Sequence, residues 1–164
     1  FYIKYKKKFN IYLTKFTEKS LKKMFKYLFI NQKNYPAVLK SNIISNKKKI
    51  RNLNIQAINV SHGTMKTIGY RINNFAYIPD FKKINNSELK KLQNLDVLII
   101  DCFRYKEHNT HVNLTECLHY IKNINPKKAY LTNLNQDLDY FELKKKIKKN
   151  NINPCYDGLK IKLN

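Results

Sequence analysis

The chain has 164 residues, enough for one domain with a buried core, and its 43% hydrophobic content is ordinary for a globular protein. The charge is not ordinary, because 33 Lys and Arg against 11 Asp and Glu give a formal net charge of +22. Three cysteines without a C-x-x-C spacing argue against a disulfide framework or a zinc ribbon and indicate a reducing cytoplasm. No apolar run approaches the roughly 18 residues that span a bilayer, so no membrane partner is expected.

Two interpretations of the high positive charge remain open. A basic surface of this size attracts phosphates, so nonspecific nucleic-acid binding is one interpretation. Lys, Asn, Ile, Tyr and Phe are also the residues whose codons are richest in A and T, and the chain is rich in all five. Codon drift in an AT-rich genome is the second interpretation, and it is the one we favour.

The first fifty residues predict a strand, a helix and a second strand. The first strand covers Ile11 to Leu13. An amphipathic helix that ends by Asn31 comes next, with its apolar stripe at Leu21, Met24, Phe25 and Leu28. The second strand runs from Leu39 to Ile44, and the segment from Asn46 to Lys49 is interpreted as a charged turn.

Three short strands then follow in succession, from Asn54 to Val60, from Thr67 to Ile72 and from Phe75 to Ile78. His62 stands just past the first of them and Asp80 just past the third. In an open α/β sheet, ligands gather at the carboxyl ends of strands, and a divalent metal such as zinc readily binds imidazole and carboxylate. A lone His and a lone Asp at strand ends are also common as turn formers, so the pattern alone leaves a metal role open.

Helices and strands alternate regularly after Asp80. Ser87 is expected to cap a short helix, and the continuous apolar run from Val97 to Ile100 predicts a strand that is buried on both faces. Asn113 with Glu116 has the spacing of a capping box and begins the next helix. This alternation, after the run of strands that precedes it, predicts a layered α/β fold.

The last part of the chain continues the same pattern. A strand is expected from Lys128 to Leu131, and Asp139 with Glu142 begins another helix with a second capping box. A turn at Asp157-Gly158 is expected to lead into a closing strand from Leu159 to Leu163.

The order of several short motifs resembles that of the metallo-β-lactamase-fold hydrolases, and most closely the branch similar to phosphoribosyl cyclic phosphate phosphodiesterase. Two metal-ligand motifs of that branch, V-x-H-G and Y-x-x-D, stand here as Val60-Ser61-His62-Gly63 and Tyr77-Ile78-Pro79-Asp80. The match covers most of the chain from about Ile11 onward and includes the pieces Leu95–Asp101, Arg104-Tyr105, Thr110-His111, Ala129–Thr132, Asp137–Tyr140 and Tyr156–Leu159. The order and spacing of so many pieces make the resemblance more specific than any one motif.

The resemblance implies an αββα sandwich of the metallo-β-lactamase type and a metal-dependent hydrolase, a phosphodiesterase on a small phosphate ester. His62 and Asp80 would be ligands of a divalent metal, Zn or in its place Mn. His111 matches a histidine that the branch uses for proton transfer or to hold a substrate oxygen, and an imidazole suits protonation of a leaving alkoxide. A loop histidine that packs on the start of the helix is the alternative for His111.

Two further residues of the same loop are candidates for substrate binding. Arg104 can clamp a phosphate through two parallel hydrogen bonds, and the plainer alternative is a surface ion pair with Glu107. His108 is the second candidate, with a solvated side chain as the alternative.

The chain departs from the family in two respects. The ligand motif H-x-H-x-D-H is absent, and because the chain begins with Phe1 and not Met, we expect residues 1–164 to be a single partial domain without its amino-terminal strands. Asn133 and Asn135 stand where the family has a histidine for a second metal. An amide oxygen is a poor zinc ligand, so a second metal site is expected to be weak or empty.

Three hypotheses follow. The first is a fragment or degenerate copy of a phosphodiesterase, inactive as the isolated chain. The second is a non-catalytic basic module that binds RNA or another polyanion on a decayed fold. The third is a nuclease of the same fold, whose substrate would suit the charge. The substrate and the oligomeric state are not defined by the sequence.

Overall fold

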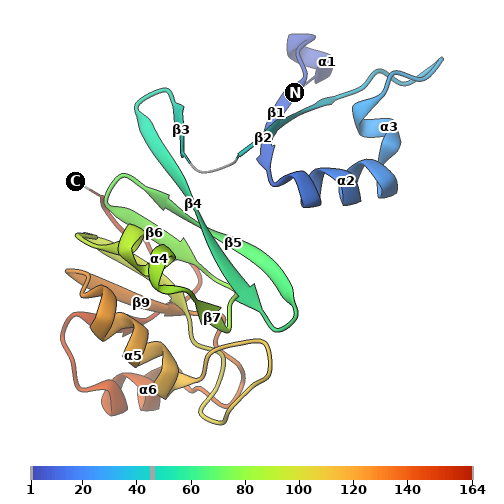
Figure 1. Cartoon of the computed structure of the whole chain (residues 1–164). Helices are drawn as coiled ribbons and strands as arrows, with labels where there is room; N and C mark the ends of the chain where they lie inside the picture. The colour runs from blue at the N-terminus through green and yellow to red at the C-terminus, as the bar shows by residue number, and fades with distance from the viewer. Residues whose placement is uncertain (1, 45–46, 164) are drawn as a thin grey trace. The chain divides into compact units, whose positions relative to one another are not determined.

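The computed structural model describes residues 2–44 and 47–163. The chain divides into two compact units, Phe1–Lys48 and Lys49–Asn164 (Figure 1). Mixed helices and strands in both units confirm the predicted α/β class. None of the helices within the described residues is long and apolar enough to cross a membrane.

The first unit is built around a parallel pair of strands, β1 (Phe9–Leu13) and β2 (Leu39–Ile43). It begins with α1 (Tyr2–Tyr5), and α2 (Lys15–Met24) and α3 (Lys26–Phe29) connect the two strands. The prediction of a single helix here is wrong. The backbone at Phe25 leaves the helical region (φ −126°, ψ 46°) and separates α2 from α3.

The second unit is built on one mixed sheet, whose strand β3 begins two residues before the boundary between the units. Among its described residues the strand order is β10-β9-β8-β6-β5-β4-β3, with β7 also paired to β4. The strands are β3 (Lys47–Ile50), β4 (Leu53–His62), β5 (Met65–Ile72), β6 (Phe75–Ile78), β7 (Lys83–Ile84), β8 (Val97–Asp101), β9 (Lys128–Thr132) and β10 (Ile152–Pro154).

The direction of these strands places several loops at one edge of the sheet. β4 and β6 are both antiparallel to β5, and β6, β8 and β9 are parallel to one another. The carboxyl ends of β4, β6, β8 and β9 therefore lie along the same edge, which is where an open α/β sheet collects its ligands.

The core lies between one face of the sheet and its helices. These are α4 (Asn86–Leu89), a short 3-10 helix (Lys90–Leu92), α5 (Leu114–Ile124) and α6 (Tyr140–Ile147). Alternate side chains of β6, β8 and β9 form one buried cluster with side chains of these helices, including Ile78, Leu98, Ile100, Leu131, Leu92, Cys117, Ile121 and Leu143. Because strand side chains alternate between the two faces, the helix-covered face carries the core and the other face is more open, with Tyr77 40% exposed.

The capping box of α5 is confirmed. The Asn113 side chain accepts a hydrogen bond from the Glu116 N–H, and the Glu116 carboxylate accepts one from the Asn113 N–H, both at 2.9 Å. Asp139 also caps α6 by accepting from Phe141 N–H and Glu142 N–H.

Three local predictions are wrong. Lys47 to Ile50 is a strand and not a turn, while the adjacent Asn46 lies outside the described residues. The N-cap of α4 is Asn85, because the helix begins before Ser87. Leu159 to Leu163 is not a strand, since the part of the sheet beyond β9 is completed by β10 instead.

Candidate metal centre

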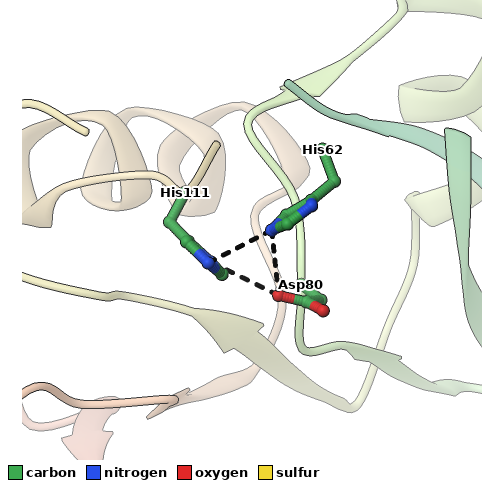
Figure 2. A group of neighbouring side chains, drawn as sticks. All are labelled: His62, Asp80 and His111. Atoms are coloured by element: carbon green, nitrogen blue, oxygen red, sulfur yellow. Dashed lines mark hydrogen bonds and ion pairs between the residues drawn. The ribbon is translucent and has the colours of Figure 1, made fainter. Parts of the chain in front are cut away.

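Three ligand-type side chains converge at the carboxyl edge of the sheet (Figure 2). His62 Nε2 lies 3.1 Å from His111 Nε2 and 3.5 Å from Asp80 Oδ1, and His111 Nδ1 lies 3.3 Å from the same carboxylate oxygen. The three residues come from the end of β4, the segment after β6 and the loop between β8 and α5. Sequence reasoning placed His62 and Asp80 at strand ends, and the structure brings both together with His111.

The turn between β4 and β5 brings His62 to this place. Gly63 follows His62 in the left-handed region (φ +62°), which favours glycine because it has no Cβ. A Cβ on Gly63 would lie only 2.8 Å from Thr110 Cγ2. The glycine therefore allows the β4–β5 turn to approach the loop that carries Thr110 and His111.

Asp80 is the most exposed member of the group, with 52% of its side chain accessible, whereas the side chains of His62 and His111 are 16% and 14% exposed. It stands two residues after the end of β6, beyond Pro79. The Oγ1 of Thr67, in β5, donates a hydrogen bond to the backbone carbonyl of Asp80 at 3.0 Å. Asp80 is thus anchored through its backbone, and its carboxylate faces both imidazoles.

His111 is held by a buried carboxylate and by an aromatic ring. Its Nδ1 lies 2.9 Å from Asp101 Oδ2, and its ring stacks on Phe103 with centroids 4.7 Å apart. The backbone around His111 is held as well, since Val112 N–H donates to the Phe81 carbonyl and Leu114 N–H, at the start of α5, donates to the Arg104 carbonyl. These contacts fix the imidazole where its Nε2 faces His62.

Asp101 was not among the candidate residues of the sequence analysis. It ends β8 with no exposed surface, and it accepts hydrogen bonds from Phe81 N–H at 3.2 Å and from Asn133 Nδ2 at 3.1 Å. Burial raises the pKa of its carboxyl group above the ordinary value, although the bonds from His111 and Phe81 act in the opposite direction. An Asp at the end of an apolar strand run, on the same sheet edge as His62 and Asp80, was the available signal.

The two substrate-binding candidates occupy the same loop. The Arg104 guanidinium donates to the backbone carbonyls of Lys106 and Glu107, so the expected ion pair with the Glu107 carboxylate is replaced by contacts that shape the loop. His108 Nδ1 accepts from Thr110 N–H and His111 N–H, each at 3.3 Å. Burial, and then the nearby charge of Arg104, lower the pKa of His108.

The two asparagines at the expected histidine positions differ in their surroundings. Asn133 follows β9 in the left-handed region (φ +60°), and its side-chain amide lies 3.1 Å from Asp101 Oδ1 and 3.3 Å from His111 Nδ1. Asn135 N–H donates to the carbonyl of Phe103. Asn133 therefore borders the site as a hydrogen-bond donor.

The chemistry of the three side chains fits a divalent metal. Two atoms bound to one tetrahedral zinc at about 2.0–2.1 Å lie about 3.3 Å apart, and the spacings of 3.1 and 3.5 Å around His62 Nε2 are close to this. His62 and Asp80 supply an imidazole and a carboxylate, both of which are ligand types of catalytic zinc, and His111 adds a second imidazole beside them. His62 Nδ1 is buried and has no hydrogen-bond partner among the described residues, so an outer partner for this ring is not provided there.

Comparison with known proteins agrees with the fold and with the motifs. A family model described as a beta-lactamase superfamily domain matches residues 3–132. The crystal structure of a diphosphatase from the PhnP family is 27% identical, with a TM-score of 0.84 over 94% of this chain and 58% of that protein. Zn²⁺-bound PqqB from Methylobacterium extorquens is 14% identical, with a TM-score of 0.72 over 98% of this chain and 67% of that protein, and shows the fold alone.

One relative found by sequence comparison is named for a different activity. An octanoyltransferase from Porphyromonas gingivalis is 27% identical over 112 residues, which are 68% of this chain and 23% of that protein. The match covers less than a quarter of that protein. The chain spans less than two thirds of this relative and of the PhnP-family diphosphatase.

Proposed function

Because the chain belongs to the β-lactamase superfamily and has the metallo-β-lactamase fold of its hydrolases, we propose that it derives from a metal-dependent phosphodiesterase acting on a small phosphate ester. The observation that supports this most directly is the convergence of His62, Asp80 and His111 within hydrogen-bonding distance of one another. The 27% identity to a PhnP-family diphosphatase supports a phosphate ester as the substrate class.

His62 and Asp80 are the proposed ligands of the metal, for which zinc is the first choice and manganese the second. Such a cation polarises a phosphoryl oxygen and supplies an activated water. His111 approaches the same point from the other side, where it would orient a substrate oxygen or protonate the leaving alkoxide. Asp101 behind the ring would stabilise the imidazolium form.

One metal per chain is the proposed stoichiometry. The side chain of Asn133 has the position expected of a histidine for the second metal, but its amide nitrogen faces Asp101 and His111 and offers no imidazole. The H-x-H-x-D-H motif is also absent from the sequence. We therefore expect the isolated chain to retain a cation but not to hydrolyse phosphodiesters.

Substitution of Asp80 by Ala tests the ligand assignment. The chain is equilibrated with zinc and dialysed, the bound metal is counted by mass spectrometry, and the affinity is measured by calorimetry. Asp80→Ala is expected to weaken zinc binding by at least about tenfold, since even partners outside the ligand shell contribute 10- to 100-fold. The exposed Asp137 provides the matched control Asp137→Ala, which should bind zinc like the parent chain. Equal zinc binding by Asp80→Ala and the parent would refute the assignment.

A non-catalytic polyanion-binding module is the second candidate function. The charge of +22 and the Asn133 position both favour it. This candidate predicts a chain that retains no zinc above the level of Asp80→Ala and that binds RNA with an affinity falling steeply as salt increases. A chain that retains zinc and shows no affinity for RNA would reject it, together with the nuclease alternative.

A further inference from the structure

The surroundings of His111 Nδ1 determine which ring nitrogen carries the hydrogen. Three polar atoms lie near this nitrogen: Asp101 Oδ2 at 2.9 Å, Asp80 Oδ1 at 3.3 Å and the Asn133 side-chain amide at 3.3 Å. Two of these three atoms are carboxylate oxygens, which accept hydrogen bonds and do not donate them when ionised. A hydrogen on Nδ1 satisfies the contact with Asp101, whereas a bare Nδ1 would face two carboxylate oxygens.

The other bonds of Asp101 point to the same assignment. Its Oδ2 accepts from the backbone N–H of Phe81, which can only donate. Its Oδ1 lies 3.1 Å from Asn133 Nδ2, which is likewise a donor. With a donor already on each oxygen and no exposed surface, the carboxylate acts purely as an acceptor, and the hydrogen in the His111–Asp101 bond belongs to the imidazole.

Asn133 has only one orientation that is compatible with this network. Rotating its amide by 180° would place its oxygen against Asp101 Oδ1, two acceptors facing each other. The amide nitrogen therefore donates to Asp101, the nearer of its two neighbours, and the contact with His111 Nδ1 is not a hydrogen bond. In this way the residue at the expected histidine position supports the carboxylate behind His111.

We propose that Asp101 is a positioning residue that fixes His111 as the Nδ1–H tautomer and turns its Nε2 toward the Nε2 of His62. This orientation brings the two Nε2 atoms of His111 and His62 to within 3.1 Å of each other.

The inference deepens the proposed function and depends on it only for its chemical consequence. With Nδ1–H held by a buried carboxylate, the ring is oriented so that Nε2 faces the proposed site. Without the carboxylate, the ring would lose its fixed tautomer and the orientation that the tautomer requires.

Long-range ¹H–¹⁵N correlation spectra of the metal-free full chain, labelled at histidine nitrogen and recorded at about pH 8, test the proposal. The His111 signals are assigned by their disappearance in His111→Gln. We expect the Nδ1 signal of His111 to be of the protonated type and its Nε2 signal of the bare type. Finding His111 protonated at Nε2 would overturn the proposal without any variant.

Variants of Asp101 test the cause. In Asp101→Ala the His111 pattern should shift toward protonation at Nε2, and in Asp101→Asn the Nδ1 hydrogen should move upfield because the charged acceptor is gone. Asp96 directly precedes β8, the strand that Asp101 ends, and its carboxylate pairs with Lys127. The matched controls are therefore Asp96→Ala and Asp96→Asn, which should leave the His111 spectrum unchanged. If burial makes Asp101→Ala unfold, Asp101→Asn decides, and an unchanged His111 spectrum in it rejects the proposal.

The outcome is separable from that of the proposed function. A chain with the expected His111 tautomer that retains no zinc would reject the metal assignment and leave the role of Asp101 intact. A chain that retains zinc while His111 carries its hydrogen on Nε2 would reject the role of Asp101 alone.

Discussion

Gly63 shows how a single residue allows the candidate metal centre to form. It takes a left-handed backbone conformation directly after His62, and its missing Cβ leaves room for the methyl group of Thr110. Thr110 directly precedes His111 in the sequence. Two histidines that are 49 positions apart therefore meet because a glycine stands beside one of them.

Gly63→Ala is expected to destabilise the chain for two reasons. The left-handed conformation costs a residue with a Cβ about 1–2 kcal/mol, and the new Cβ would lie 2.8 Å from Thr110 Cγ2 and push the loop away. The free energy of unfolding, measured with urea, should fall by more than the conformational strain alone. The affinity for zinc should fall as well, because the same contact displaces the turn that carries His62, a proposed ligand.

Gly158 provides a matched control for this substitution. It also has a positive φ (+86°), but no atom lies within 4 Å of the position its Cβ would take. Gly158→Ala therefore measures the strain without the contact. A double variant combines Gly63→Ala with Thr110→Ser, which removes the methyl group. Its loss of unfolding free energy relative to Thr110→Ser should then be similar to that of Gly158→Ala. Equal losses of unfolding free energy from Gly63→Ala, from Gly63→Ala combined with Thr110→Ser and from Gly158→Ala would show that the contact with Thr110 is irrelevant.

Sequence patterns could identify His62 and Asp80 because both follow recognisable apolar strands. They could not identify the partners of His111, since Asp101 and Asn133 lie 10 and 22 positions from it along the chain and meet it only in the folded sheet. Arg104 shows the converse. Its charge suggested a phosphate clamp or an ion pair, whereas its guanidinium bonds two backbone carbonyls of its own loop.

At the scale of elements, Glu88 connects α4 to the sheet. Its carboxylate accepts from Asn59 N–H of β4 at 2.9 Å and from Lys91 Nζ at 2.6 Å, and only 8% of the residue is exposed. Burial by itself would raise the pKa of Glu88, but the hydrogen bonds from Lys91 and Asn59 outweigh it and the pKa lies below the ordinary value of 4.5.

Glu88→Gln is expected to lower the free energy of unfolding by about 1 kcal/mol at neutral pH, since an ionised acceptor is replaced by a neutral one. A lowered pKa in the folded state stabilises the protein above the ordinary pKa, and this stabilisation is lost as the pH falls through the folded pKa. The difference between the parent and Glu88→Gln should therefore be full at pH 7 and shrink below about pH 4.5. Urea denaturation at a series of pH values measures it.

Glu142 offers the control, because its side chain is 67% exposed and pairs with Lys145 on the surface of α6. Glu142→Gln should change the stability by less than about 0.5 kcal/mol, with little dependence on pH. A pH-independent difference for Glu88→Gln would contradict the linkage.

Elements with strong local signals were predicted well, and those that depend on a partner were not. The capping box at Asn113 and Glu116 lies within the first turn of one helix, so the sequence contains all of it. The alternating residues from Leu159 to Leu163 have the pattern of a strand, but a strand also requires a hydrogen-bonded neighbour, and β9 pairs with β10 instead. The break at Phe25 was not predicted because the apolar stripe continues across it.

At the scale of the whole molecule, the two units differ in core and in charge. All members of the main hydrophobic cluster, from Ile58 to Ile152, belong to the second unit. In the described part of the first unit the buried hydrophobic residues are Leu13, Ala37 and Ile44. The first unit contains thirteen lysines and a single acidic residue, Glu18, whose carboxylate already contacts Lys22 and Ser41.

A chain of residues 47–164 is therefore expected to fold and to keep the candidate metal centre, because its core and all three converging side chains are retained. Circular dichroism, cooperative urea unfolding and zinc binding measure this. The isolated first unit should not unfold cooperatively, because so few of its side chains are buried. A shortened chain that lacks cooperative unfolding would show that the second unit depends on the first.

The sequence by itself determined the α/β class, the family motifs and most of the secondary structure, because these depend on the periodicity of residues that are near one another along the chain. It also placed His62 and Asp80 at strand ends. Only the tertiary structure decided that these two side chains meet His111, and that Asp101 and Asn133 hold this histidine from behind. Such proximity depends on the order and direction of strands in the sheet, which are set by long-range pairing of backbone groups and burial of the core, and no local pattern records them.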